Sequence, residues 1–219
     1  MSEERHGLAG DADAAPRPQA VTFITTEHFV LQGARAATIA ESTARANMFL
    51  AAVSGGLIAV GLVATASEVG TAFYAFGLVL LPTLAFVGLM TFERVVQTAI
   101  EDYGYARRIA LLRGYYFENA PEIEPFLLSV PPSERMRVQG LGGGRWQALR
   151  TVGGMVAVIT AVLVGSTVGL AAAVVSDHSL AAALAFGAPT TLLALTAMIR
   201  FQRATWKAAA DAPLSFDDG

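Results

Sequence analysis

The sequence predicts an all-α integral membrane protein with four transmembrane helices arranged as two helical hairpins, the first extended into the cytoplasm as a helical stalk. Three observations carry this prediction: four long uncharged apolar runs, loops that differ sharply in basic residues, and a low charge content. Only 15% of the 219 residues are charged, whereas ordinary soluble domains carry about 25%. Much of the chain is therefore not made to face water.

Each apolar run reaches the roughly 18 residues that mark a candidate transmembrane helix. The second run is uncharged from Thr71 to Phe92, which gives about 33 Å of helix, enough to cross a bilayer core of about 30 Å. Helices of soluble proteins rarely lack charge over such lengths, because one face normally meets solvent. The four predicted spans cover about 48–66, 72–92, 152–175 and 180–199.

The basic residues predict the orientation of these spans. All 15 Lys and Arg residues lie before the first span, between the second and third, or after the fourth. The two short loops at 67–71 and 176–179 contain none. Because cytoplasmic loops carry an excess of Lys and Arg, both termini and the long middle segment are predicted to be cytoplasmic. We expect the protein in the plasma (inner) membrane.

The first hairpin is expected to continue beyond the membrane as two packed helices, which we call the stalk (residues 26–47 and 93–119). Neither segment contains proline, and the first is rich in alanine, so both favour helix. Thr25 or Thr26 is the expected N-cap, and Glu41 with Arg45 forms a favourable i,i+4 pair. Apolar residues at three- and four-residue spacing predict the antiparallel contact. The residues expected there are Leu31, Ala34, Val96, Ile100 and Tyr103. In the alternative, the upstream helix lies flat on the membrane surface.

These predictions divide the chain into five segments. They are a disordered cytoplasmic tail (1–25), the first hairpin with its stalk (26–119), a Pro/Gly-rich cytoplasmic connector (120–150), the second hairpin (151–207) and a disordered acidic tail (208–219). Trp146 and Trp206 flank the second hairpin, where indole rings favour the headgroup region and can act as membrane-interface anchors.

Small residues and prolines mark positions of predicted helix packing. Gly165 and Gly169 form a G-x-x-x-G motif, with Ala161 and Ala173 on the same face, and such a stripe lets another helix approach closely. Gly55 gives the first span a similar small face. Two such stripes in one chain predict a homo-oligomer, although internal packing can use either of them.

Two prolines lie within predicted spans. Pro82 and Pro189 each remove a backbone hydrogen bond and are expected to kink their helices, either as gating hinges or simply as packing features. Thr83 and Thr190 follow them directly and can satisfy backbone groups that proline frees.

No catalytic, cofactor-binding or metal-binding site is predicted. The chain has no cysteine, its three histidines are far apart in the sequence, and its net charge of −3 argues against nucleic-acid binding. No ionisable residue lies inside a span, where transporters usually keep one.

The predicted function is therefore a non-enzymatic membrane protein that acts in assembly, scaffolding or signalling through the stalk. Its expected partners are the lipid bilayer, further copies of itself and a cytoplasmic protein. Two alternatives stay open. One is an oligomeric pore lined by hydroxyl groups and hinged at the prolines. The other is a lipid-modifying enzyme that uses Glu101, Asp102 or nearby arginines.

Overall fold

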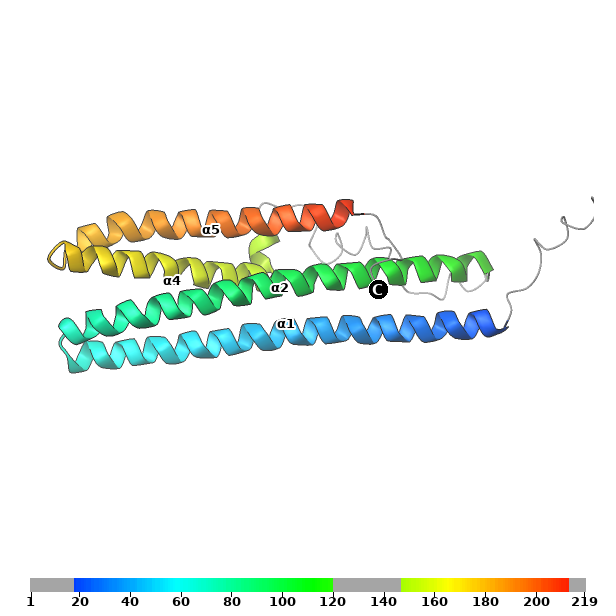
Figure 1. Cartoon of the computed structure of the whole chain (residues 1–219), viewed down its shortest axis with the longest axis horizontal. Coiled ribbons are helices and arrows are strands. Elements are labelled where there is room, and N and C mark those ends of the chain that lie inside the picture. The colour runs from blue at the N-terminus through cyan, green and yellow to red at the C-terminus, as the bar shows by residue number, and fades with distance from the viewer. Residues whose placement is uncertain (1–17, 120–146, 213–219) are drawn as a thin grey trace, which may run out of the picture.

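The computed structural model describes residues 18–119 and 147–212, and within these ranges the regular structure is entirely helical (Figure 1). A short 3-10 helix, η2 (Gln147–Arg150), precedes α4. Each of the four α-helices is long and apolar enough to cross a membrane, which confirms the prediction of an all-helical chain with four potential spans. These helices are α1 (Pro18–Ala66), α2 (Thr71–Asn119), α4 (Val152–Val175) and α5 (Leu180–Asp211).

The start of α1 differs from the sequence prediction. The helix already begins at Pro18, so residues 18–25 are helical and do not belong to a disordered tail. Thr25 and Thr26 are not caps, because their hydroxyls donate to the carbonyls of Val21 and Thr22 one turn back, at 2.8 and 2.9 Å. Hydroxyls bonded in this way lie within a helix. Proline fits the first turn because its missing N–H would have no helical partner there.

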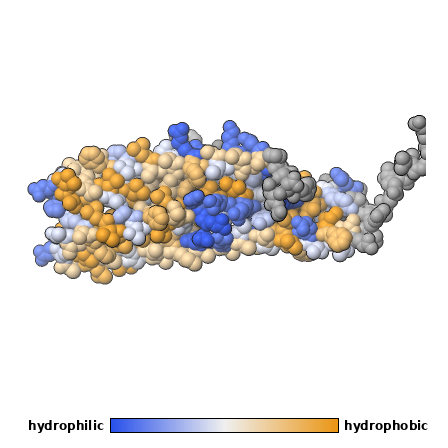
Figure 2. All heavy atoms as spheres, in the orientation of Figure 1, coloured by the Kyte–Doolittle hydropathy of each residue, from blue (hydrophilic) through white to orange (hydrophobic). Residues whose placement is uncertain are grey.

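α2 passes from its apolar half into its charged half as one helix of 49 residues, about 73 Å long at 1.5 Å per residue. That length is more than twice the roughly 30 Å of a bilayer core. Figure 1 shows α1 and α2 side by side along their lengths and reaching well past the end of α4. Figure 2 shows a largely hydrophobic surface between the turn end of the molecule and a hydrophilic cluster near the middle of its length.

The two short turns share one backbone geometry. Glu68 and Val69 in the first turn, and Asp177 and His178 in the second, have φ angles from 50° to 64°, a region that residues other than glycine rarely adopt. The amide of Val69 donates to the Ala64 carbonyl at 3.0 Å, and the amide of His178 donates to the corresponding carbonyl of α4 at 2.7 Å. Bonds of this type satisfy carbonyls of the last helical turn. α1 and α4 therefore end in the same way.

The helices follow the order α1, α2, α4, α5, and each packs mainly against its neighbours in that order (Figure 1). Phe49 of α1 is 1% exposed, and a Cβ added to Gly88 of α2 would lie 2.9 Å from its ring. Thr160 of α4, which is also fully buried, contacts the same point. Gly88 therefore lets three helices meet. The remaining core residues are Ala46, Val53, Leu81, Leu84, Ala85, Phe92, Val96, Val156, Ala157, Leu163 and Met198.

α4 and α5 approach each other through their backbones. A Cβ added to Gly169 would lie 2.9 Å from the Ala183 carbonyl oxygen, and one added to Gly187 would lie 2.9 Å from the Gly165 carbonyl oxygen. The sequence left the partner of the α4 stripe open, and within this chain that partner is α5. The buried stripe consists of Ala161, Gly165, Gly169 and Ala173.

Both prolines lie inside continuous helices, Pro82 in α2 and Pro189 in α5. The hydroxyl of Thr83 donates to the carbonyl of Val79 at 2.7 Å, and Thr190 makes the equivalent bond in α5 at 2.7 Å. Proline at position 82 leaves the carbonyl of residue 78 without its usual donor. The hydroxyl of Thr83 therefore does not bond to the freed carbonyl itself. It bonds to the carbonyl of Val79, the next residue on the same helical turn.

Candidate functional site

The half of the α1–α2 pair that corresponds to the predicted stalk is held together by an apolar seam. Leu31 and Val96 are buried, Ile100 packs against the core from a half-buried position, and Ala34 is half-buried. Tyr103, also expected at this seam, is half-buried, and its ring lies 5.6 Å from that of Trp206 on α5. Tyr103 therefore connects the predicted stalk to the second pair of helices.

Ion pairs join α1 and α2 along this seam. Arg35 donates from Nε to Asp102 Oδ1 at 2.7 Å and from a terminal nitrogen to Oδ2 at 3.4 Å, and both side chains are less than one third exposed. Glu41 accepts from Arg94 at 3.0 Å across the seam and from Arg45 at 2.9 Å within α1. The Glu41–Arg45 pair was predicted from its spacing. The two pairs between helices were not, because the register between α1 and α2 cannot be read from the sequence.

The same contacts shift the acidity of Glu41. Its hydrogen bond with Arg94, and then that with Arg45, lower the pKa of the Glu41 carboxyl below its ordinary value. The carboxylate in turn raises the pKa of the Arg94 guanidinium. Glu41 therefore stays ionised in the folded protein to a lower pH than an ordinary glutamate.

The C-terminal end of α5 is bound to α2. Arg107 donates to the carbonyls of Ala212 at 2.9 Å and Ala209 at 3.4 Å. A guanidinium in this position satisfies carbonyls that a helix end leaves unpaired and favours the negative end of the helix dipole. This contact explains why α5 continues to Asp211, past residue 207, where a disordered acidic tail was expected to begin.

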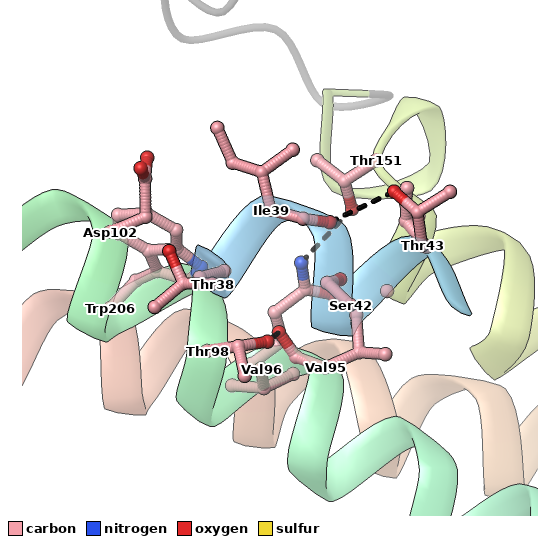
Figure 3. A pocket seen from close by; sticks show the side chains of 14 residues that line it. Thr38, Ile39, Ser42, Thr43, Val95, Val96, Thr98, Asp102, Thr151 and Trp206 are labelled. Atoms are coloured by element: carbon pink, nitrogen blue, oxygen red, sulfur yellow. Dashed lines mark hydrogen bonds between the residues drawn. The ribbon is translucent and has the colours of Figure 1, made fainter. Parts of the chain in front are cut away.

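A pocket of about 260 Å³, which we call the junction pocket, lies where α1, α2, α5 and the start of α4 converge (Figure 3). Gln202 of α5 is 5% exposed and donates from Nε2 to Thr151 Oγ1 at 3.3 Å, whereas its Oε1 has no hydrogen-bond partner among the described residues. Thr151 is also the N-cap of α4, where its hydroxyl accepts from the Gly154 amide at 3.0 Å. The pocket wall is completed by Thr38, Ile39, Ser42, Thr43, Val95, Val96, Thr98, Ala99, Asp102, Val152, Gly153 and Trp206.

α1 presents a second, outward face that meets no other helix of the described chain. We call it the outer stripe. Its positions alternate at three and four residues, and at about 100° per residue those from Ala40 to Ile58 lie on the side of α1 opposite the buried Phe49. All of them are exposed and none carries a charge. They are Phe23, Thr26, Val30, Gly33, Ala37, Ala40, Ala44, Asn47, Ala51, Ser54, Ile58 and Gly61.

Gly55 adjoins the outer stripe and was predicted to pack a helix. It is exposed, and an added Cβ would have no atom within 4 Å. The small face of α1 therefore has no partner within the described chain, in contrast to the small face of α4.

Two aromatic contacts gave no sequence signal. His28 lies ten residues inside α1, half-buried, with its ring 6.4 Å from that of Tyr116. Burial, followed by the charge of Arg113, lowers the pKa of His28. The ring of His178 in the second turn lies 4.4 Å from that of Tyr74, so this turn contacts the first residues of α2. Trp146, predicted as an interface anchor, lies outside the described residues, as does most of the Pro/Gly-rich connector.

The hydroxyls at predicted membrane depth mostly donate to their own helices. Thr167 bonds to the Leu163 carbonyl at 2.8 Å and Thr191 to the Gly187 carbonyl at 3.0 Å. Thr160 is different, since its buried hydroxyl has no partner among the described residues. Within those same ranges, no three His, Asp or Glu side chains gather closely enough to hold a metal ion.

Comparisons of the chain with protein-family models, with curated proteins and with solved structures found no match. Two features of the molecule are candidates for function: the outer stripe of α1, which continues into the predicted stalk, and the junction pocket.

Proposed function

We propose that this protein is a non-enzymatic, multi-pass protein of the plasma (inner) membrane that assembles into homo-oligomers and holds a helical stalk in the cytoplasm as a scaffold or signalling element. The distribution of basic residues supports this orientation, because the short turns at 67–70 and 176–179 carry none while the opposite end of the helices is rich in arginine. The assembly function is supported by the surface of α1.

The observation that carries the proposal is the outer stripe of α1. Arg35 and Glu41 are engaged with α2, and Arg45 is bound to Glu41. The side of α1 that would face water in the stalk is instead lined by Phe23, Val30 and small residues. A helix with one face in water normally places its charges on that face. The reversed arrangement favours a protein partner on the outer stripe.

A second copy of this chain fits the outer stripe best. The three- and four-residue spacing averages 3.5 residues, which is the repeat of helices that pack along a continuous seam. Glycine and alanine at half of its positions permit close approach both in water and in lipid. All copies insert with the same orientation, so two outer stripes face each other in parallel and in register. The stripe also continues from the stalk into the first predicted span, as an α1–α1 contact would require.

Disulfide crosslinking tests the proposal directly, because the chain has no cysteine of its own. In native membranes, single cysteines replacing Ala37 or Ala51 should form disulfide-linked dimers under mild oxidation. A matched cysteine replacing Gln97, which is exposed on α2, should stay monomeric. Equal crosslinking at all three positions, or none at Ala37 and Ala51, would contradict the proposal. A crosslink of Ala37→Cys to a different protein would replace the second copy with that partner.

A further inference from the structure

The junction pocket contains hydrogen-bonding groups that the protein does not satisfy. Gln202 Oε1 belongs to a side chain that is 95% buried and has no donor among the described residues. Ser42 and Trp206 also line the pocket, and neither the Ser42 hydroxyl nor the Trp206 indole makes a hydrogen bond to any described group. A buried acceptor without a partner is unfavourable, so a molecule that brings a donor to Gln202 Oε1 would be stabilised in the pocket.

The other polar groups of the wall are already engaged. Thr38 donates to the Arg35 carbonyl at 2.8 Å and Thr43 to the Ile39 carbonyl at 3.0 Å. Thr98 donates to carbonyls of its own helix at 3.1 Å. Their hydroxyl hydrogens are therefore used, whereas their oxygens can still accept. The wall as a whole offers several acceptors and a smaller number of free donors.

The charges near the pocket exclude a simple ion site. Of the described residues in the wall, only Asp102 is ionisable, and Arg35 already neutralises it at 2.7 Å. An anion would face the Asp102 carboxylate and would bring no donor for Gln202 Oε1. An ammonium group would bring donors, but it would offer no acceptor to Trp206 and would lie near the Arg35 guanidinium. A hydroxyl group both donates and accepts, and it needs no counter-charge.

We propose that the junction pocket binds a neutral polyhydroxyl group, with one hydroxyl donating to Gln202 Oε1. Its volume of about 260 Å³ leaves room for a small polyol such as glycerol. Ile39 and Val152 at the wall are 52% and 40% exposed, and the pocket lies where the charged ends of the predicted spans begin. A lipid headgroup can therefore supply the hydroxyls, and so can a free polyol.

Tryptophan fluorescence provides the test. A Trp146→Phe variant leaves Trp206 as the single tryptophan, and Trp206 is part of the pocket wall. In detergent, this protein is titrated with short-chain phosphatidylglycerol, with phosphatidylmethanol of the same chains, with phosphatidylethanolamine and with free glycerol. Phosphatidylmethanol carries the same phosphate without the diol. We expect a saturable fluorescence change with phosphatidylglycerol or with glycerol, and no change with phosphatidylmethanol. A change with phosphatidylglycerol but not with glycerol would identify a lipid headgroup as the ligand, and a change with glycerol would identify a free polyol.

Gln202→Leu should weaken the response at least tenfold, whereas Gln97→Leu, an exposed glutamine outside the pocket, should leave it unchanged. If Gln202→Leu fails to fold, as judged by gel filtration and thermal melting, Ser42→Ala is the second variant and should weaken binding severalfold. A response that is equal for phosphatidylglycerol and phosphatidylmethanol, a response to phosphatidylethanolamine alone, or binding unchanged in both pocket variants would overturn the proposal. So would the absence of any saturable change.

Discussion

The small-residue stripes of α4 and α1 look alike in sequence and are used in opposite ways. On α4 the stripe is buried, and Gly165 and Gly169 bring the backbone of α5 into contact. On α1 the outer stripe is exposed, and neither Gly33 on the stripe nor Gly55 beside it has an atom within 4 Å of an added Cβ. Small residues therefore permit close approach of another helix without specifying which helix that is. The α4 stripe packs against α5 within the chain, whereas the outer stripe of α1 stays exposed and available to another molecule.

The greatest change in stability is expected when a buried glycine of the α4 stripe, and not an exposed glycine of α1, is replaced by valine. Gly169→Val would push a side chain against the Ala183 carbonyl, and overpacking of this kind costs about 1–3 kcal/mol or more. We expect a clear drop in the melting temperature of the detergent-solubilised protein, or failure to fold. Gly55→Val, which meets open space, should leave the melting temperature nearly unchanged. Similar losses in both variants would break the comparison.

The next effect concerns assembly and leaves the fold intact. Ala40→Glu places a charge on the outer stripe, where a second copy would have to bury it, so the oligomer should dissociate to monomers in gel filtration with light scattering. The melting temperature of the monomer should stay within experimental error, because residue 40 is exposed. Gln97→Glu adds the same charge on α2 and should not alter the oligomeric state. A strictly monomeric wild-type protein would remove the basis of this prediction.

The smallest effect concerns the ion pairs of Glu41 and the dependence of their stabilising contribution on pH. The pKa of Glu41 is lowered in the folded state, so its stabilising contribution is present above its unfolded pKa of about 4.5. It is lost as the pH falls through the lower folded value. Amide hydrogen exchange around residues 35–45 should therefore accelerate as the pH falls below 4.5, after correction for the intrinsic exchange rate. Glu41→Gln should exchange faster than wild type at neutral pH and should show less of this acid step. An acid step of the same size in both proteins would assign it to another group.

The sequence was sufficient for the features that depend on local patterns. Uncharged length predicted four helices that can span a membrane, and the absence of proline between Glu93 and Asn119 predicted that α2 continues unbroken. The four-residue spacing of Glu41 and Arg45 predicted their ion pair. In each case the pattern lies within one helix, where geometry follows directly from residue number.

Features that depend on register between helices could not be predicted. Tyr103 belongs to the apolar stripe of α2 and yet contacts Trp206, because α5 extends beside α2 where α4 has not yet begun. The junction pocket joins residues from four separate helical segments, and Gln202 gave no signal because a single glutamine after an apolar span usually faces solvent. The start of α1 was placed too late because threonine can cap a helix or bond within one, and only the backbone distinguishes these roles.

The order of the helices has a consequence for how the molecule is made. Since each helix from α2 onward packs against the helix that precedes it in the chain, no segment has to wait for a later part of the chain before it can dock. α1 and α2 can pack together as soon as α2 leaves the ribosome, and α4 can then pack against α2. A truncated chain ending after α2 should therefore already hold its ion pairs, and biogenesis can proceed one hairpin at a time in the direction of translation.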